Sequence, residues 1–398
     1  MESLTLHIPQ GINYECQSCG KCCGGWAVPM TETDYDRISE VDWQGVSPLA
    51  KQNGLYRELK KHESANTPYT HKIVSETGVC PFLVDKLCHI HAERGMEFKP
   101  TICQLFPYCF TETPSGVYAT VSFVSEGAVY NAGRPLADQH DQLERKWAEF
   151  RRLYPDYKPD WSHTRLTVDK PVSWEDYLRM EERLLAILSD ASKRLEERMW
   201  ECSLFLRAQL SGGTVPADVP SLEEAPPLNS LDKSVLAIFH RMYFPAKPSK
   251  QGDGDFKITR MVGEHFIGSK RIQMPGESFT LAELVSFPFC TDPEVDNLLY
   301  RYVFSYVYGK KYFGAGFGQV SLVPGFHHII LMLSLVKLHS KAVAKTRGAH
   351  SVSMLDVAAT VRQLERMVGE TKLDGYSAAA WEMLLGPGTR ARRFLAHI

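Results

Sequence analysis

The sequence predicts a mainly α-helical protein, in which an irregular, cysteine-rich metal-binding N-terminal domain with a small β element (residues 1–135) precedes an α-helical domain (residues 136–398). Two observations lead to this prediction. Eight of the ten cysteines fall within the first 109 residues, where frequent prolines interrupt regular structure. Farther along the chain, apolar residues recur at intervals of three and four, which is the repeat of an amphipathic helix.

The N-terminal domain is expected to hold only short elements. Thr31, with Asp34 three residues later, predicts the capped start of a short helix. Prolines punctuate residues 64–115, so the cysteines there are expected on loops and short helical turns. The segment "GVYATVSFV", which begins at Gly116, is rich in β-branched and aromatic residues and predicts a strand.

The second domain is expected to be built from helices. Residues 137–154 predict one helix, and residues 173–210 predict a longer one that Ser173 caps. Residues 211–230, rich in Pro, Gly and Ser, predict a linker or surface loop, and residues 247–257 predict a second one. Further helices are expected at 231–244, 281–288, 293–309, 326–346, 353–370 and 377–385.

Charge and hydropathy exclude several classes of protein. Lys and Arg number 45 against 47 Asp and Glu, so no basic excess indicates nucleic-acid binding. The N-terminal segment "MESLTLHIPQGINYEC" lacks the basic and apolar regions of a signal peptide, which predicts a cytoplasmic protein. The most apolar window, residues 326–343, is interrupted by Lys337 and predicts a core helix rather than a membrane span.

The clustered cysteines indicate a metal or iron–sulfur centre. A reducing cytoplasm disfavours disulfides, and free cysteines that serve only as small apolar residues have no reason to recur as C-x2-C-x2-C-C. The candidate ligands are Cys16, Cys19, Cys22, Cys23, Cys80, Cys88, Cys103 and Cys109. His89 and His91 could replace a thiolate, whereas Cys202 and Cys290 lie in predicted apolar helical regions and are not expected to be ligands.

The spacing of these cysteines leaves the metal open between iron and zinc. C-x2-C-x2-C begins a ferredoxin-like pattern, but Cys23 follows Cys22 directly, where that pattern needs three intervening residues. The later pairs, C-x7-C and C-x5-C, do not match the paired C-x2-C knuckles typical of zinc. An iron–sulfur cluster is favoured because a multi-iron cluster tolerates long, irregular spacings, and the adjacent Cys22 and Cys23 are expected to serve different tasks.

Three segments carry a family resemblance: "CQSCGKCC", "CPFLVDKLCHI" and "KPTICQLFP". Together they resemble the CxxCxxCC family of zinc- or iron-chelating proteins. "CCGGWAVPMTETDY", "CPFLVDKLCHIHAERGMEFKPTICQLFP" and the helical "LLYRYVFSYVYGKKYF" look most like its flagellin lysine-N-methylase (FliB-like) branch. That branch implies a cysteine-bound centre and the transfer of methyl groups from S-adenosylmethionine to lysines of a protein partner such as flagellin. The chain departs from the branch where Ser122 and Ser125 stand near the place of a further cysteine.

Two classes of function follow from these observations. The first is an enzyme, a protein-lysine N-methyltransferase that carries a metal or iron–sulfur centre. The second is a noncatalytic protein that stores, delivers or senses iron or zinc. No Ser-His-Asp order, HExxH or P-loop motif is evident in the sequence, so no catalytic residue is assigned.

Overall fold

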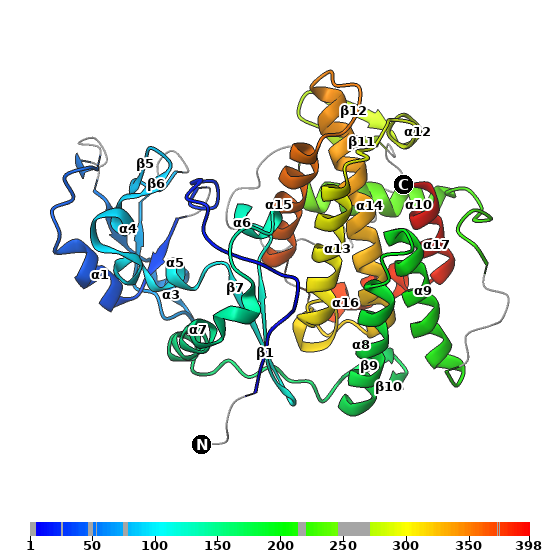
Figure 1. The fold of residues 1–398 in the computed structure, drawn as a ribbon, viewed down its shortest axis with the longest axis horizontal. Coiled ribbons are helices and arrows are strands. Elements are labelled where there is room, and N and C mark those ends of the chain that lie inside the picture. The colour runs from blue at the N-terminus through cyan, green and yellow to red at the C-terminus, as the bar shows by residue number, and fades with distance from the viewer. Residues whose placement is uncertain are drawn as a thin grey trace. The chain divides into compact units, whose positions relative to one another are not determined.

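The computed structural model describes residues 5–24, 27–46, 51–52, 54–74, 79–213, 220–245, 271–371, 373 and 375–398. The chain forms two compact units. The first contains Met1–Phe110 and Ala119–Lys158, and the second contains Thr111–Tyr118 and Pro159–Ile398. The predicted fold class is confirmed, since small sheets occupy the cysteine-rich region and helices dominate the rest (Figure 1).

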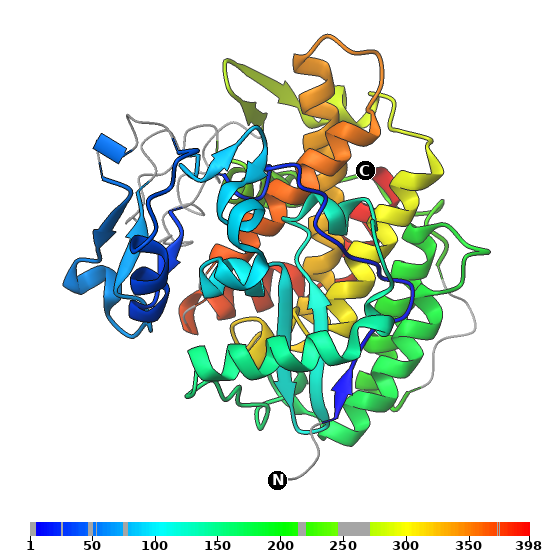
Figure 2. The ribbon, with the colours of Figure 1, turned by 60° about the vertical axis from the view of Figure 1, so that its left-hand side comes forward.

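The β structure of the cysteine-rich region is divided among three small sheets (Figure 2). The predicted strand at Gly116 is found, and it lies between its two neighbours in the largest of these sheets. The three sheets are β1(Leu6–His7)-β8(Gly116–Val121)-β7(Tyr108–Thr113), β2(Pro29–Met30)-β4(His71–Ile73)-β3(Tyr56–Glu58) and the hairpin β5(Leu83–Val84)-β6(Leu87–Cys88).

The first unit also holds short helices. α1 (Glu32–Ser39) starts as predicted, because the Thr31 side chain accepts from Asp34 N while the Asp34 carboxylate accepts from Thr31 N. α7 (His140–Leu153) fulfils the prediction for residues 137–154. The other helical segments are α3 (Lys61–Ser64), α4 (His89–Arg94), η1 (Met96–Phe98), α5 (Thr101–Leu105), α6 (Glu126–Val129) and η2 (Leu136–Gln139).

Several cysteines pack against one apolar cluster in the first unit. Trp43 and Phe82 are each 1% exposed, and their rings meet edge to face. Three half-buried cysteines pack against this cluster: Cys80, Cys88 and Cys103. The core that stabilises the first unit therefore also fixes the positions of these three thiols.

Most helices of the second unit follow the predicted boundaries closely. Two departures are residues 173–210, which form two helices instead of one, and the last helix, α17, which was not predicted. The helices are α8 (Trp174–Leu188), α9 (Leu195–Ala208), α10 (Ser230–Tyr243), α12 (Leu281–Val285), α13 (Pro293–Tyr308), α14 (Leu322–Thr346), α15 (Met354–Glu370), α16 (Gly375–Leu385) and α17 (Gly388–His397). Short segments accompany them: the hairpins β9(Arg165–Thr167)-β10(Lys170–Pro171) and β11(Arg271–Met274)-β12(Glu277–Thr280), and the turns η3 (Gln209–Ser211) and η4 (Gly314–Gly316).

The break between α8 and α9 has a local cause. Asp190 Oδ1 accepts from the backbone N and the side chain of Ser192, which gives the chain an alternative to helical hydrogen bonds. The buried Arg198 then donates to Leu188 O at 2.7 Å, so the end of α8 is tied to α9. Apolar periodicity runs through this break, and the sequence therefore predicted one helix where there are two.

The two predicted loops differ in how far they are described. The described part of the first, residues 211–213 and 220–230, contains no strand, and its only helical residues are Ser211, which ends η3, and Ser230, which begins α10. The second, residues 247–257, lies outside the described residues. Cys290 was expected in a helical region, but it lies in the irregular connection between α12 and α13.

The longest helix, α14, forms the centre of the second unit and contacts α9, α10, α15, α16 and α17. It begins earlier than the predicted residue 326 and reaches 25 residues, which by length and composition would suffice to cross a membrane. Its most apolar window is 94% buried against the rest of the protein. The interpretation as a core helix fits this burial.

A buried ion pair joins parts of the second unit that are far apart in sequence. Lys310, which is 0% exposed, places its ammonium 2.9 Å from the Glu181 carboxylate and 2.8 Å from Tyr308 O. The same ammonium lies over the ring of Tyr118 in strand β8. Helix α8, the end of α13 and strand β8 thus share one buried charge.

Candidate metal centre

Six of the eight candidate cysteines line one cavity of about 70 Å³ in the first unit. The thiols come from three stretches of the chain, which are the opening cysteine motif, the segment around the β5–β6 hairpin, and residues 96–106, and Tyr14, Val28 and Ile73 complete the wall. The lining thiols are Cys16, Cys22, Cys23, Cys80, Cys88 and Cys103, and Lys99 lines the same cavity.

The opening motif reaches the cavity through a tight turn. Cys23 N donates to Gly20 O at 3.1 Å, and Gly20 has a φ of +69°, a conformation that favours glycine. A Cβ atom at Gly20 would lie 3.1 Å from the Leu83 side chain and 3.2 Å from Lys86 O. Glycine is therefore needed both for the turn and for its close approach to the β5–β6 hairpin.

The hairpin itself positions the second pair of thiols. Leu83 N donates to Cys80 O at 2.9 Å, and Leu83 pairs with Cys88 across the hairpin. The connecting residues Asp85 and Lys86 both have positive φ, as expected for a tight two-residue turn. The C-x7-C spacing therefore belongs to a hairpin that brings its two ends, and both thiols, to one place.

Cys103 is placed by a buried carboxylate. Asp34 is 1% exposed, and its two oxygens accept from Thr101 N, each at 3.1 Å, at the start of α5. The Thr101 hydroxyl donates to the same carboxylate at 2.9 Å, and Arg37 donates to it at 2.7 Å. The arrangement satisfies a backbone N–H at the start of α5 and fixes the helix that carries Cys103.

The backbone of Lys99 is also fixed by hydrogen bonds. Arg37 and Gln104 both donate to Lys99 O, at 2.9 and 2.8 Å, and Pro100 follows directly. The Lys99 side chain is 9% exposed. Among the residues that the structure describes, no carboxylate lies within ion-pair distance of its ammonium.

The deeper thiols lie in surroundings that favour the protonated form. Burial raises the pKa of Cys80 to about 11, and the neighbouring Cys88 contributes to the increase. Burial likewise raises the pKa of Cys103, and Cys80 and Cys88 add to this effect. Lys99 opposes the increase at both Cys80 and Cys103. A cation that bound here would displace protons from these thiols.

The adjacent Cys22 and Cys23 have different surroundings. A hydrogen bond from the Cys22 side chain is the main cause that lowers the pKa of Cys23, burial opposes it, and Lys99 lowers this pKa further. Cys88 and Cys103 act on Cys23 in the opposite direction. Cys23 therefore belongs electrostatically with the deeper thiols, while Cys22 donates to it from beside them.

The donor set fits iron or zinc, since cysteine thiolates bind both. In the described residues, no three cysteine sulfur atoms all lie within 4.8 Å of one another. Thiolates on one tetrahedral zinc ion would lie about 3.8 Å apart, because each Zn–S bond is about 2.3 Å long. The sulfur atoms are thus spread more widely than one zinc ion would hold them.

The other candidate ligands lie elsewhere. Cys19 and Cys109 are not among the cavity-lining residues, and the Cys109 thiol donates to Pro107 O at 3.6 Å. His89 accepts from Gly45 N at 3.1 Å, and its Nε2 also lies 2.8 Å from the Glu93 carboxylate. His91 does not line the cavity either. The predicted non-ligand Cys202 is buried in α9, in the second unit.

Sequence reasoning did not identify Lys99 or Asp34 as parts of this site. Lys99 stands in "KPTICQLFP", four residues before Cys103, and a lysine followed by proline gives no sign that its side chain is buried. Asp34 was read as a helix cap only. Its contact with Thr101 joins residues far apart in sequence, so no local pattern could have disclosed it.

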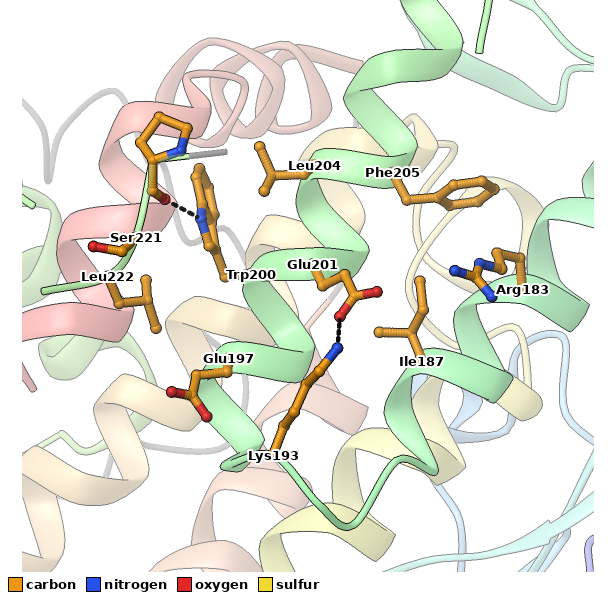
Figure 3. A pocket seen from close by; sticks show the side chains of 11 residues that line it. Arg183, Ile187, Lys193, Glu197, Trp200, Glu201, Leu204, Phe205, Ser221 and Leu222 are labelled. Atoms are coloured by element: carbon orange, nitrogen blue, oxygen red, sulfur yellow. Dashed lines mark hydrogen bonds and ion pairs between the residues drawn. The ribbon is translucent and has the colours of Figure 1, made fainter. Parts of the chain in front are cut away.

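A second pocket of about 590 Å³ lies in the helical unit, between α8, α9 and residues 220–222 (Figure 3). The Trp200 indole N–H donates to Pro220 O at 2.9 Å, and the Lys193 ammonium lies 2.6 Å from the Glu201 carboxylate. Its volume is within the range of roughly 300–1,000 Å³ that is usual for small-molecule sites. Its lining includes Arg183, Ile187, Glu197, Leu204, Phe205 and Leu222.

Comparisons with known proteins concern the cysteine-rich region. Residues 15–120, which contain all eight candidate cysteines, match the CxxCxxCC family, described as "Putative zinc- or iron-chelating domain". An uncharacterised protein of Methanocaldococcus jannaschii is 35% identical over 101 residues, which are 25% of this chain and 30% of that protein. The match therefore spans less than a third of that relative. No solved structure matches this chain. Neither similarity distinguishes the lysine-N-methylase branch.

Proposed function

We propose that the first unit binds an iron–sulfur cluster through Cys23, Cys80, Cys88 and Cys103, with Cys16 and Cys22 beside it. The observation that carries this proposal is the single cavity, which six thiols and one lysine line. The wide separation of the sulfur atoms favours a cluster over one zinc ion, because cluster ligands bind different irons and so lie farther apart.

Anaerobic purification followed by elemental analysis tests this proposal. We expect iron and acid-labile sulfide in similar amounts, together with a brown colour and absorption near about 400 nm that bleaches on reduction. Cys103→Ser should lose most of this iron, and Cys202→Ser, which changes a buried cysteine of the other unit, is the matched control. A colourless protein that contains one zinc per chain would refute the cluster.

A second candidate function is methyl transfer from S-adenosylmethionine to a lysine of a protein partner. The pocket between α8 and α9 favours it, because its size and chemistry suit an adenosyl ligand (Figure 3). Phe205 could stack on an adenine, Glu197 could accept from ribose hydroxyls, and Arg183 could pair with the carboxylate of the methyl donor.

Calorimetry with S-adenosylmethionine tests this second function. Phe205→Ala should weaken binding roughly 5- to 150-fold, which is the usual effect of losing one base-stacking ring. Phe304→Ala is the matched control, since Phe304 is also half-buried on a helix of the second unit but does not line the pocket. Absence of heat at millimolar ligand would count against methyl transfer and favour a noncatalytic role in iron or zinc storage, delivery or sensing.

A further inference from the structure

The ammonium of Lys99 stands out among the charged groups of the first unit. The residue is 9% exposed, and it lines a cavity whose other polar groups are mainly thiols. An ammonium on a largely buried residue is stabilised when a negative charge lies nearby. None of the carboxylates in the described part of the chain forms an ion pair with Lys99. The thiols of the cavity become negatively charged when they lose their protons on binding a metal centre, and this charge can compensate the Lys99 ammonium.

The backbone shows that this placement is built into the fold. Arg37 holds Lys99 O and is itself held by Asp34, whose carboxylate also fixes Thr101 at the start of α5. One buried group therefore sets the positions of both Lys99 and Cys103. These contacts fix the backbone from which the Lys99 side chain extends, in register with the helix that carries Cys103.

We propose that Lys99 is the internal counter-ion of the metal centre, placed so that its ammonium balances part of the negative charge of the thiolates of Cys23, Cys80 and Cys103. This inference rests on the proposed metal-binding function. Four thiolates around a doubly charged zinc ion, or around a doubly charged four-iron cluster, carry a net charge of about minus two. The Lys99 ammonium reduces that charge by one.

The geometry of the cavity supports the proposal. Lys99 lines the same cavity as Cys23, Cys80 and Cys103, although the three cysteines come from three different segments of the chain. Lys99 thus stands beside the thiols of the proposed site while contributing no ligand of its own.

Cobalt(II) is a suitable probe, because its thiolate charge-transfer absorption reports both affinity and the number of thiolate ligands. We expect Lys99→Met and Lys99→Gln to bind cobalt(II) roughly 10- to 100-fold more weakly than the wild type, which is the usual effect of losing a group that tunes a metal site. Lys99→Arg should remain within about threefold, because it keeps the charge. Lys86→Met, which removes an exposed lysine two residues from Cys88, should also remain within about threefold.

The outcomes separate the inference from the function on which it rests. Wild-type affinity in both neutral variants, with a native circular dichroism spectrum, would overturn the role of Lys99 while leaving the metal site intact. An equal loss in Lys99→Arg would also overturn it, since geometry rather than charge would then be the cause. Failure of the wild type to bind, or equal binding by Cys103→Ser, would overturn the proposed metal site itself. If the protein carries iron, the neutral variants should also show a lower reduction potential.

Discussion

Replacing Asp34 with alanine should release the helix that carries Cys103. The change removes the acceptor for Thr101 N, for the Thr101 hydroxyl and for Arg37. A hydrogen bond to a charged group contributes about 1.5–3 kcal/mol, and breaking a buried charged network costs about 3–5 kcal/mol in total. Arg37 is 29% exposed and can turn to water, so we expect the lower end of this range, about 3 kcal/mol.

Hydrogen exchange on the whole chain measures this loss where it occurs. A local opening free energy reduced by about 3 kcal/mol makes the amides of residues 99–106 exchange roughly 150-fold faster, since 1.4 kcal/mol is a factor of about ten. Asp36→Ala is the control, because Asp36 lies on the same helix but is exposed. Exchange within about threefold of the wild type would show that Asp34 does not hold α5, and our account of how Cys103 is positioned would fail.

Three further predictions concern the two units. Cys103→Ser should lose most of the bound metal, whereas Cys109→Ser, which lies outside the cavity, should keep at least about four-fifths of it by elemental analysis; equal losses would contradict the assignment. Glu181→Ala should lower the free energy of urea unfolding by about 3–5 kcal/mol, because it leaves the Lys310 ammonium buried and unpaired. Adding Lys310→Met should recover most of that loss, and no recovery would contradict the reasoning. Burial lowers the pKa of Lys310 from 10.5 to about 8, so between these values the unfolded chain binds the proton more tightly. Stability should therefore rise with pH from about 8 to 10.5 in the wild type, and this rise should be smaller in Lys310→Met; identical pH profiles would argue against the lowered pKa of Lys310.

Local patterns in the sequence predicted most of the helical unit. The start of α1 at Thr31 and the bounds of α10, α13 and α15 follow from caps and apolar periodicity, which act over a few residues. The break between α8 and α9 was missed, because the apolar repeat continues across it. Apolar periodicity indicates which face of a helix is buried. It does not reveal a turn between two helices when the apolar repeat continues from one helix into the next.

The candidate site, too, could be predicted only in part from local patterns in the sequence. Clustering indicated eight candidate thiols, but spacing alone could not separate Cys19 and Cys109 from the six cysteines that line the cavity. That distinction depends on where β7 leads its side chains, which is a property of the tertiary fold. The role of Asp34 likewise depends on a contact with α5, distant in sequence. Neither follows from residue types and intervals.

The thiols that line the cavity come from three segments that are distant in sequence, so metal binding should affect how long the protein survives in a cell. An ion or cluster bound to Cys23, Cys80 and Cys103 acts as a cross-link that closes two long loops of the chain, so its binding free energy becomes folding free energy of the first unit. The second unit contains none of these thiols, so the cross-link acts directly on the first unit. Metal starvation would therefore expose the first unit to proteases before the second, and the amount of intact protein would follow the metal supply.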